Sequence, residues 1–244
     1  MFQAAQNSIQ NRLLAALPTE EYQRLTPYLE NVTLAEGKVI YQPYAPIEYV
    51  YFPQQAIVSL VSIMDDGTTV EVGLVGDDGM VGLPVILGGE TTITQAFVQV
   101  AGCGMKMKAD RLSSEFDRGG RLQRLLLRYT QALLTQASQR VACNRLHTIE
   151  ARLASWLLTV QDRMHSDQFH LTQEFISQML GTRRSSVTVA AGTLSKAGII
   201  SYSRGNITVL DRQRLEAIAC ECYHVIHSEY ERLVGARKIL SDKD

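Results

Sequence analysis

The sequence predicts an α+β chain with an N-terminal β-roll, a long helix and a C-terminal helical module that ends in two short strands. Three changes of pattern along the 244 residues indicate this order. Residues 32–107 contain short β-prone runs separated by Gly, Pro and Asp, residues 121–145 contain no Gly or Pro, and residues 169–210 contain two short helical patterns before two β runs. Many closely spaced short strands are typical of a sandwich or jelly roll.

The N-terminal part is expected to begin with a short helix within residues 12–30 that breaks at Pro27. The best strand candidates are residues 38–41, 49–52, 56–64, 70–75 and 96–100. Asp66-Gly67 lies between two of these runs and predicts a two-residue hairpin.

The uninterrupted stretch 121–145 predicts one long helix with an apolar seam. The seam consists of Leu122, Leu126, Tyr129, Leu133, Ala137 and Val141. We interpret the seam as a dimerisation surface, and the alternative is that it packs only on the chain's own β-roll. A second helix is expected over 148–164, with Ile149, Leu153, Trp156, Leu157 and Val160 facing inward.

The most informative segment, residues 169–210, has the pattern of a winged helix-turn-helix. Thr172 is a suitable N-cap for its first helix, and Gly181 a suitable end. Thr182 is expected to cap the second helix, which Gly198 ends. The apolar face of the second helix is Val187, Ala190, Ala191 and Leu194. The turn Arg204-Gly205-Asn206 separates the two wing strands.

The exposed side of that second helix carries side chains that can contact bases and phosphates of double-stranded DNA. Our DNA-binding candidates are Thr172, Gln173, Thr182, Arg183, Arg184, Ser185, Ser186, Thr188, Val189, Lys196 and Arg204. The alternative for this segment is an ordinary amphipathic helical hairpin.

The distribution of charge agrees with a nucleic-acid partner, although the net charge of the chain is only −1. Residues 1–100 hold three basic and eleven acidic groups, which gives −8, and the remainder therefore carries +7. Between residues 170 and 206 the single acid is Glu174. An acidic first half joined to a basic second half favours a sensor linked to a nucleic-acid module.

Several other classes find no support in the sequence. No run of about 18 apolar residues predicts a membrane span, and the first residues lack a signal-peptide pattern, so we expect a cytoplasmic protein without a membrane partner. No P-loop, G-x-S-x-G or H-E-x-x-H motif is present, so we expect no enzyme and no catalytic residue. Four cysteines do not suggest a secreted disulfide framework.

The order of these elements resembles the Crp/Fnr family of bacterial transcription regulators over about residues 15–210. The resemblance is strongest in LTQEFISQMLGTRRSSVTVAAGTLSKAGII and in GKVIYQPYAPIEYVYFPQQAIVSLV. It implies a cyclic-nucleotide-binding-like roll that senses an effector, a homodimer, and paired reading helices on a palindromic promoter site, with RNA polymerase as a further partner for an activator. By position, Arg184 and Ser185 would read bases, followed by Thr188 and Val189.

The roll departs from the family members that bind cyclic AMP. The resemblance implies an effector pocket around Val81, Gly82, Leu83, Thr94, Gln95 and Ser138. Leu83 stands where those members have a Glu that holds the ribose, and Thr94-Gln95 replaces the Arg pair that holds the phosphate. A buried phosphodiester would lose charge-assisted hydrogen bonds of roughly 1.5–3 kcal/mol each. We therefore expect no cyclic AMP binding and leave the effector unidentified.

Other cofactors of the family find little support either. The iron–sulfur branch has several cysteines near the N-terminus, whereas the first cysteine here is Cys103. A haem-bound gas sensor stays open, because axial ligands vary, although the first histidine is His147.

The sequence beyond the wing contains CECYHVIH within a helix expected from Asp211 to about Leu240. On a continuous helix Cys220, His224 and His227 share one face and Cys222 points elsewhere. We expect no metal site here and interpret the cysteines as small buried residues; the alternative is a thiophilic metal bound by Cys220, His224 and His227.

The expected domains are a sensor roll (1–118), a dimerisation helix and linker (119–146), a winged helix-turn-helix (147–212) and a helical extension (213–244). The predicted function is a homodimeric, sequence-specific transcription regulator. The alternatives are a constitutive architectural DNA binder with a ligand-free roll, or a regulatory protein-interaction module.

Overall fold

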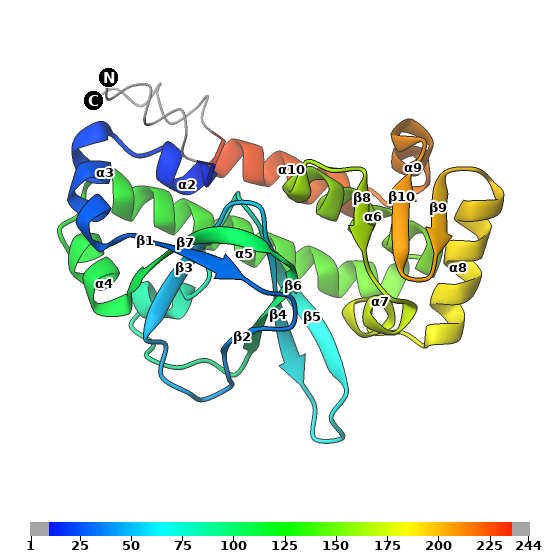
Figure 1. Cartoon of the computed structure of the whole chain (residues 1–244), viewed down its shortest axis with the longest axis horizontal. Coiled ribbons are helices and arrows are strands. Elements are labelled where there is room, and N and C mark those ends of the chain that lie inside the picture. The colour runs from blue at the N-terminus through cyan, green and yellow to red at the C-terminus, as the bar shows by residue number, and fades with distance from the viewer. Residues whose placement is uncertain (1–9, 236–244) are drawn as a thin grey trace. The chain divides into compact units, whose positions relative to one another are not determined.

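The computed structural model describes residues 10–235 (Figure 1), and the expected end of the C-terminal helix near Leu240 lies outside these residues. The chain forms two compact units. The first contains the residues up to Leu60, Leu74–Thr135 and the residues from Ser228 on, and the second contains Val61–Gly73 and Gln136–His227. Within residues 10–235, no helix has both the length and the apolar character needed to cross a bilayer.

Two antiparallel sheets make the predicted β-roll. One has the order β1-β7-β3, and the other has the order β2-β6-β4-β5. The strands are β1 (Glu30–Leu34), β2 (Val39–Tyr41), β3 (Tyr49–Pro53), β4 (Ile57–Ile63), β5 (Thr69–Val75), β6 (Gln95–Val100) and β7 (Gly102–Lys108). The five strands expected from sequence are therefore confirmed as β2 to β6.

Strands β1 and β7 were missed because their sequences lack a strong β signal. In β7, Gly102-Cys103-Gly104 precedes the only apolar alternation. The structure explains one of these glycines, because a Cβ at Gly104 would lie 2.7 Å from the carbonyl oxygen of Phe52 on the neighbouring β3. Close approach of two backbones thus decides the residue at this position.

Apolar side chains from both sheets form the core of the roll. The buried cluster contains Leu34, Tyr41, Ile47, Tyr51, Ala56, Val58, Val75, Val81, Ala96 and Val98. Burial of this face is the main source of stability for the roll.

The β4–β5 hairpin has a three-residue loop, so the predicted two-residue turn was wrong. The backbone amide of Met64 donates to the carbonyl of Thr68 over 2.9 Å, which leaves residues 65–67 in the loop. Gly67 has φ +81°, the left-handed conformation that closes such a loop. The Asp66 carboxylate accepts a hydrogen bond from the Thr68 amide at 2.9 Å.

The predicted N-terminal helix is two helices, α2 (Arg12–Ala15) and α3 (Thr19–Leu25), followed by the 3₁₀ turn η1 (Thr26–Tyr28). Pro18 separates the two because it precedes the first turn of α3. The buried Asn11 side chain caps α2 and donates to the carbonyls of Pro53 at 2.8 Å and Gly79 at 3.0 Å. This amide therefore fixes α2 on the roll.

A short η2 (Leu83–Leu87) and α4 (Ala109–Asp117) precede the long helix α5 (Gly120–Leu146). The Glu21 carboxylate accepts from the first amides of α5, Arg121 at 3.0 Å and Leu122 at 2.7 Å. A carboxylate at this end compensates the unpaired amides and the helix dipole.

Three members of the predicted dimer seam lie in the protein's own core. Leu122, Leu126 and Tyr129 are at most 2% exposed, and the Tyr129 hydroxyl donates to the Met80 carbonyl at 3.0 Å. These three side chains are buried within the chain itself, so they offer no exposed surface to a partner. Leu133 and Ala137 are half-buried, whereas Val141 is exposed.

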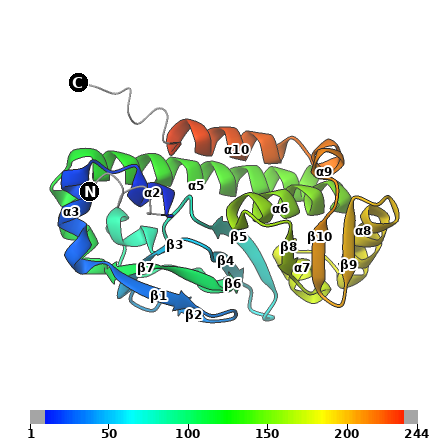
Figure 2. The same ribbon diagram turned by 45° about the horizontal axis from the view of Figure 1, so that its top comes forward.

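The second unit contains the remaining elements, from the end of α5 onward (Figure 2). They are α6 (Ile149–Met164), β8 (Gln168–His170), α7 (Gln173–Met179), α8 (Arg184–Lys196), β9 (Ile200–Ser203), β10 (Asn206–Val209), α9 (Arg212–Ile218) and α10 (Cys222–Leu233), whose last turns belong to the first unit. Thr148 caps α6 as expected, and Leu153, Trp156, Leu157 and Val160 are buried. The strand β8 was not predicted because it has only three residues; it pairs with β10 in the order β8-β10-β9.

The predicted continuous C-terminal helix is interrupted between α9 and α10. Ala219 leaves the helical conformation with ψ 145°, and Cys220 lies in the break. Residues spaced for one helix face therefore no longer share a face.

Candidate nucleic-acid interface

Helices α7 and α8 form the helix-turn-helix expected from the sequence. The Thr172 hydroxyl accepts from the Phe175 amide at 3.2 Å, which confirms the N-cap of α7. Gly181 has φ +56° in the turn, as a helix-ending glycine requires. Thr182 does not cap α8, because the N-cap position is Arg183, which makes no side-chain cap bond.

The two faces of α8 divide as predicted. Val187, Ala190, Ala191 and Leu194 are at most 3% exposed. The opposite face is open, and it carries the predicted readers Arg183, Arg184, Ser185, Thr188 and Val189. Among the other candidates, Thr172, Lys196 and Arg204 are exposed, and Gln173, Thr182 and Ser186 are partly covered.

An open groove of about 350 Å³ lies between the start of α8 and the wing. Its lining consists of Thr172, Gln173, Arg184, Tyr202, Arg204 and Gly205. Four of these lining residues are predicted DNA-binding candidates: Thr172, Gln173, Arg184 and Arg204. The structure thus brings together residues from the start of α7, the start of α8 and the wing. Lys196 is at the last turn of α8 and does not line this groove.

Tyr202 and Gly205 line the groove but were not among the candidates predicted from the sequence. Tyr202 is the one with a side chain that can contact a ligand. Its hydroxyl donates to the Leu171 carbonyl at 3.0 Å, which ties the wing to the start of α7. Burial raises the pKa of Tyr202, and the positive charge of Arg184 opposes this rise. The phenol is therefore neutral near pH 7 and keeps its donated bond. The sequence offered one signal for this role, which is the aromatic Tyr202 in β9, the first strand of the wing.

The wing turn places Arg204 at the groove. Arg204 and Gly205 have φ +50° and +84°, as in a type I′ turn, and Ser203 pairs with Asn206. The turn therefore has two residues, and Asn206 begins β10 instead of belonging to the turn. A Cβ at Gly205 would lie 2.7 Å from Cε1 of His170, so a larger residue here would have to displace the His170 side chain and adopt a strained positive φ.

Hydrogen bonds hold the polar side chains at the start of α8. The Thr188 hydroxyl lies 2.8 Å from Oε1 of Gln173 and 3.0 Å from the Arg184 carbonyl. In the described part of the chain, no carboxylate forms an ion pair with Arg183, Arg184 or Arg204. Their charges are available to a polyanion.

The residues expected around an effector are divided between the units. Val81, Gly82 and Leu83 are buried in the first unit, and Gly82 has φ +103° with Val50 Cγ1 2.9 Å from a Cβ at that position. Gln95 donates to Oε1 of Gln42 at 2.6 Å, and Thr94 lies 3.2 Å from the Thr92 hydroxyl. Ser138 is exposed and belongs to the second unit.

The cysteine and histidine candidates are arranged differently from the sequence prediction. Cys220 and Cys222 lie together with Cys143 and His147, and the four potential ligand atoms are all within 4.8 Å of one another. His224 and His227 are exposed on α10 and do not take part. The alternative set of Cys220, His224 and His227 does not come together, because the helix breaks at Cys220.

Comparison with known proteins agrees with this architecture. Residues 151–218 match the model of the Crp-like helix-turn-helix domain. The search of curated proteins gave no match.

The fold is similar to FixK2 from Bradyrhizobium japonicum, with TM-score 0.68 and 21% identity over 79% of this chain and 98% of that one. It is also similar to a CRP family transcriptional regulator from Thermus thermophilus, with TM-score 0.63 and 19% identity over 77% and 96%. A third similar structure is CLP from Xanthomonas campestris, described as a c-di-GMP responsive global regulator, with TM-score 0.65 and 12% identity over 79% and 99%. Residues 151–218 are therefore similar to the Crp-like helix-turn-helix domain, and the fold of the chain is similar to the folds of these solved structures.

Proposed function

We propose that the protein is a sequence-specific DNA-binding transcription regulator that acts as a homodimer on a palindromic promoter site. The observation that carries this proposal is the groove bordered by the open face of α8 and by the wing, with Arg184 on one side and Arg204 on the other. Helix-turn-helix proteins place the second helix in the major groove, where its N-terminal residues contact base edges.

The two arginines have different proposed roles. Arg184 is the first residue of α8, so its guanidinium can enter the major groove and bind guanine through two hydrogen bonds. Arg204 is at the tip of the wing and can contact the phosphate backbone, which carries no direct sequence information.

The test is a selection of bound sites from random DNA, followed by fluorescence anisotropy with the selected duplex. Arg184→Ala should cost roughly 1–3 kcal/mol and relax one base position, whereas Arg204→Ala should weaken all sequences alike. Arg214→Ala, which changes an exposed arginine on α9, is the matched control and should leave affinity unchanged. If Arg184→Ala keeps the full sequence preference, α8 is not the reading helix.

For the dimer, the exposed apolar stripe of α5 is the proposed contact. Leu127, Leu134 and Val141 are 49%, 64% and 74% exposed and follow each other at seven-residue intervals. This spacing repeats on one side of a helix and suits a seam with a second copy of α5. Two reading helices related by two-fold symmetry would then meet half-sites about one DNA turn apart.

The proposed input is an effector of the roll other than cyclic AMP. Leu83 is 8% exposed at the first position of η2, so an apolar side chain occupies the place where a ribose-binding carboxylate is expected. Thermal-shift measurements with a metabolite panel separate a sensor from a ligand-free scaffold, because only a ligand of the folded state raises the midpoint. The panel should include cyclic di-GMP, in view of the description of CLP. Micromolar binding of cyclic AMP in a calorimeter would contradict this part of the proposal.

A further inference from the structure

Three cysteines and one histidine from distant parts of the sequence meet inside the second unit. Cys143 is in the last turns of α5 and His147 follows that helix, whereas Cys220 is in the break before α10 and Cys222 begins α10. The three cysteines are buried and reduced, and His147 is partly exposed. Two pairs of potential metal ligands, Cys143 with His147 and Cys220 with Cys222, are thus more than 70 residues apart in the sequence and close together in the structure.

The four potential ligand atoms are close enough together to share a single ion. Sγ of Cys143 lies 3.5 Å from Sγ of Cys220, and Sγ of Cys222 lies 3.5 Å from Nδ1 of His147. With Zn–S bonds of about 2.3 Å and Zn–N bonds of about 2.0 Å, a regular tetrahedron places two sulfurs roughly 3.8 Å apart and a sulfur and a nitrogen roughly 3.5 Å apart. The two separations given above are within a few tenths of an ångström of these values, and every other pair of ligand atoms lies within 4.8 Å.

The surroundings supply the outer hydrogen bonds that a metal site needs. His147 offers Nδ1 to the cluster, while its Nε2 lies 3.2 Å from a carboxylate oxygen of Glu221. A metal-binding imidazole nearly always donates its second N–H to such a group, which fixes the orientation of the ring. Ser155 Oγ lies 3.1 Å from Sγ of Cys220, and the Gln139 amide donates to Sγ of Cys222 at 3.3 Å.

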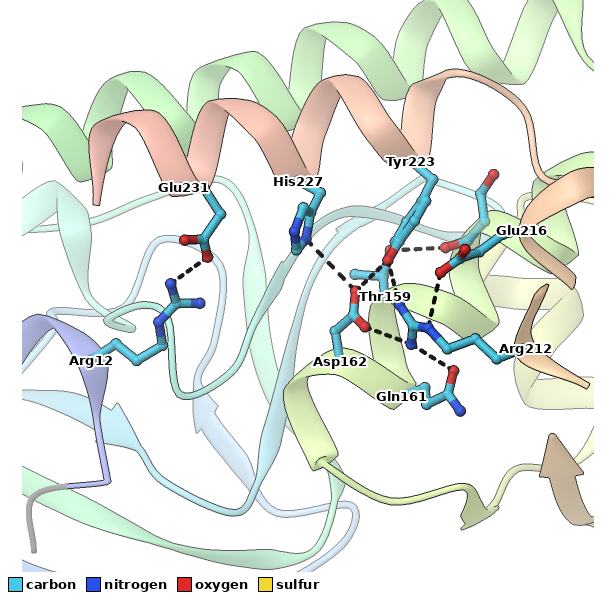
Figure 3. A network of polar contacts seen from close by, with 10 residues as sticks. Arg12, Thr159, Gln161, Asp162, Arg212, Glu216, Tyr223, His227 and Glu231 are labelled. Atoms are coloured by element: carbon cyan, nitrogen blue, oxygen red, sulfur yellow. Dashed lines mark hydrogen bonds and ion pairs between the residues drawn. The ribbon is translucent and has the colours of Figure 1, made fainter. Parts of the chain in front are cut away.

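A polar network joins α9 and α10, the helices on either side of the break that contains Cys220 (Figure 3). Arg212 of α9 contacts Asp162 of α6 at 2.8 Å, and the Tyr223 hydroxyl of α10 donates to the same carboxylate at 2.7 Å. Arg212 also donates to the Tyr223 hydroxyl at 2.8 Å and pairs with Glu216 at 2.9 Å. The break between α9 and α10 is therefore braced on both sides, as a preorganised site requires.

We propose that Cys143, His147, Cys220 and Cys222 bind one Zn²⁺ ion as a closed structural site. Three thiolates and one imidazole are a ligand set typical of structural zinc, and four protein ligands leave no open coordination position for a substrate. The three thiols lose their protons on binding. The ion would join the end of α5 to the α9–α10 junction, next to the helix-turn-helix.

The experiment is metal analysis of the full chain, purified without a His-tag under reducing conditions. We expect one zinc per chain. After exchange, cobalt(II) should give the intense visible absorption of tetrahedral coordination and a thiolate-to-metal charge-transfer band. Cys222→Ser and His147→Gln should abolish or strongly reduce both signals. Cys103→Ser, in the first unit, and His224→Ala, on α10 outside the cluster, are matched controls that should retain them.

A milder variant keeps the test decisive if Cys222→Ser does not fold. Glu221→Gln leaves all four ligands in place and should weaken zinc binding by roughly 10–100-fold in a chelator competition. Wild-type protein that contains no zinc and gives no tetrahedral cobalt spectrum overturns the proposal. Thiol titration showing a Cys143–Cys220 disulfide without bound metal would also overturn it, because the cluster would then be a redox pair.

Discussion

Replacement of Glu71 by Ala should strongly destabilise the second unit, because it removes one partner of a buried ion pair. The Glu71 side chain is fully buried, and its Oε1 lies 3.0 Å from Nη1 of Arg140 and 3.3 Å from Nε1 of Trp156. Glu71 lies in β5, within the segment Val61–Gly73 that belongs to the second unit. The change therefore also tests how this segment is attached to the rest of the unit.

The expected magnitude follows from burial. Breaking a buried ion pair by removing one partner costs roughly 3–5 kcal/mol, because the other charge stays buried without compensation. Arg140 is 16% exposed and can turn partly toward water, so we expect the lower end, about 3 kcal/mol. At an m-value of about 2 kcal/mol per molar urea, the unfolding midpoint falls by roughly 1.5 M.

The assay is urea unfolding followed by Trp156 fluorescence, since this is the single tryptophan of the chain. Glu71→Gln should cost less, because an amide still accepts a hydrogen bond from the indole. Asp65→Ala, an exposed acid in the loop of the same hairpin, is the control and should change little. A double-mutant cycle with Arg140→Met should be strongly non-additive. The reasoning fails if Glu71→Ala costs no more than Asp65→Ala.

Three further changes test other parts of the structure. Leu134→Glu should shift the protein from dimer to monomer, because it would bury a charge in the proposed seam. Sedimentation velocity at a fixed protein concentration measures this shift, and an unchanged sedimentation coefficient would place the dimer contact elsewhere. Gly205→Ala should lower the free energy of unfolding by roughly 1–3 kcal/mol in urea, because alanine is strained at positive φ and its Cβ would contact His170. The same change should weaken DNA binding, and an unchanged affinity would show that the wing is not part of the interface. Tyr223→Phe should cost roughly 1.5–3 kcal/mol in unfolding free energy, because Asp162 loses a short hydrogen bond, and a loss below about 0.5 kcal/mol would contradict that role.

Local patterns were reliable where periodicity and turn chemistry were strong. The apolar face of α8, the cap at Thr172 and the glycines at 181 and 198 were all predicted, because each depends on residues within one or two turns of chain. Weak or short elements were missed for the same reason: β7 has glycines where a β pattern is expected, and β8 is stabilised by pairing with β10.

Contacts between distant residues decided what the local pattern could not. Tyr129 and Val141 were assigned to the same apolar seam, yet Tyr129 is buried within the chain and Val141 is exposed. The same holds for Tyr202, which reaches the groove through a bond to Leu171, 31 residues earlier.

The sequence alone determined the helix-turn-helix, its exposed arginines and the roll before it, because periodicity, capping and charge are written in neighbouring residues. Only the tertiary structure decided that Cys143 and His147 meet Cys220 and Cys222. The short break between α9 and α10 changes the direction of the side chains beyond it, and no periodic pattern encodes the packing that holds such a break in place.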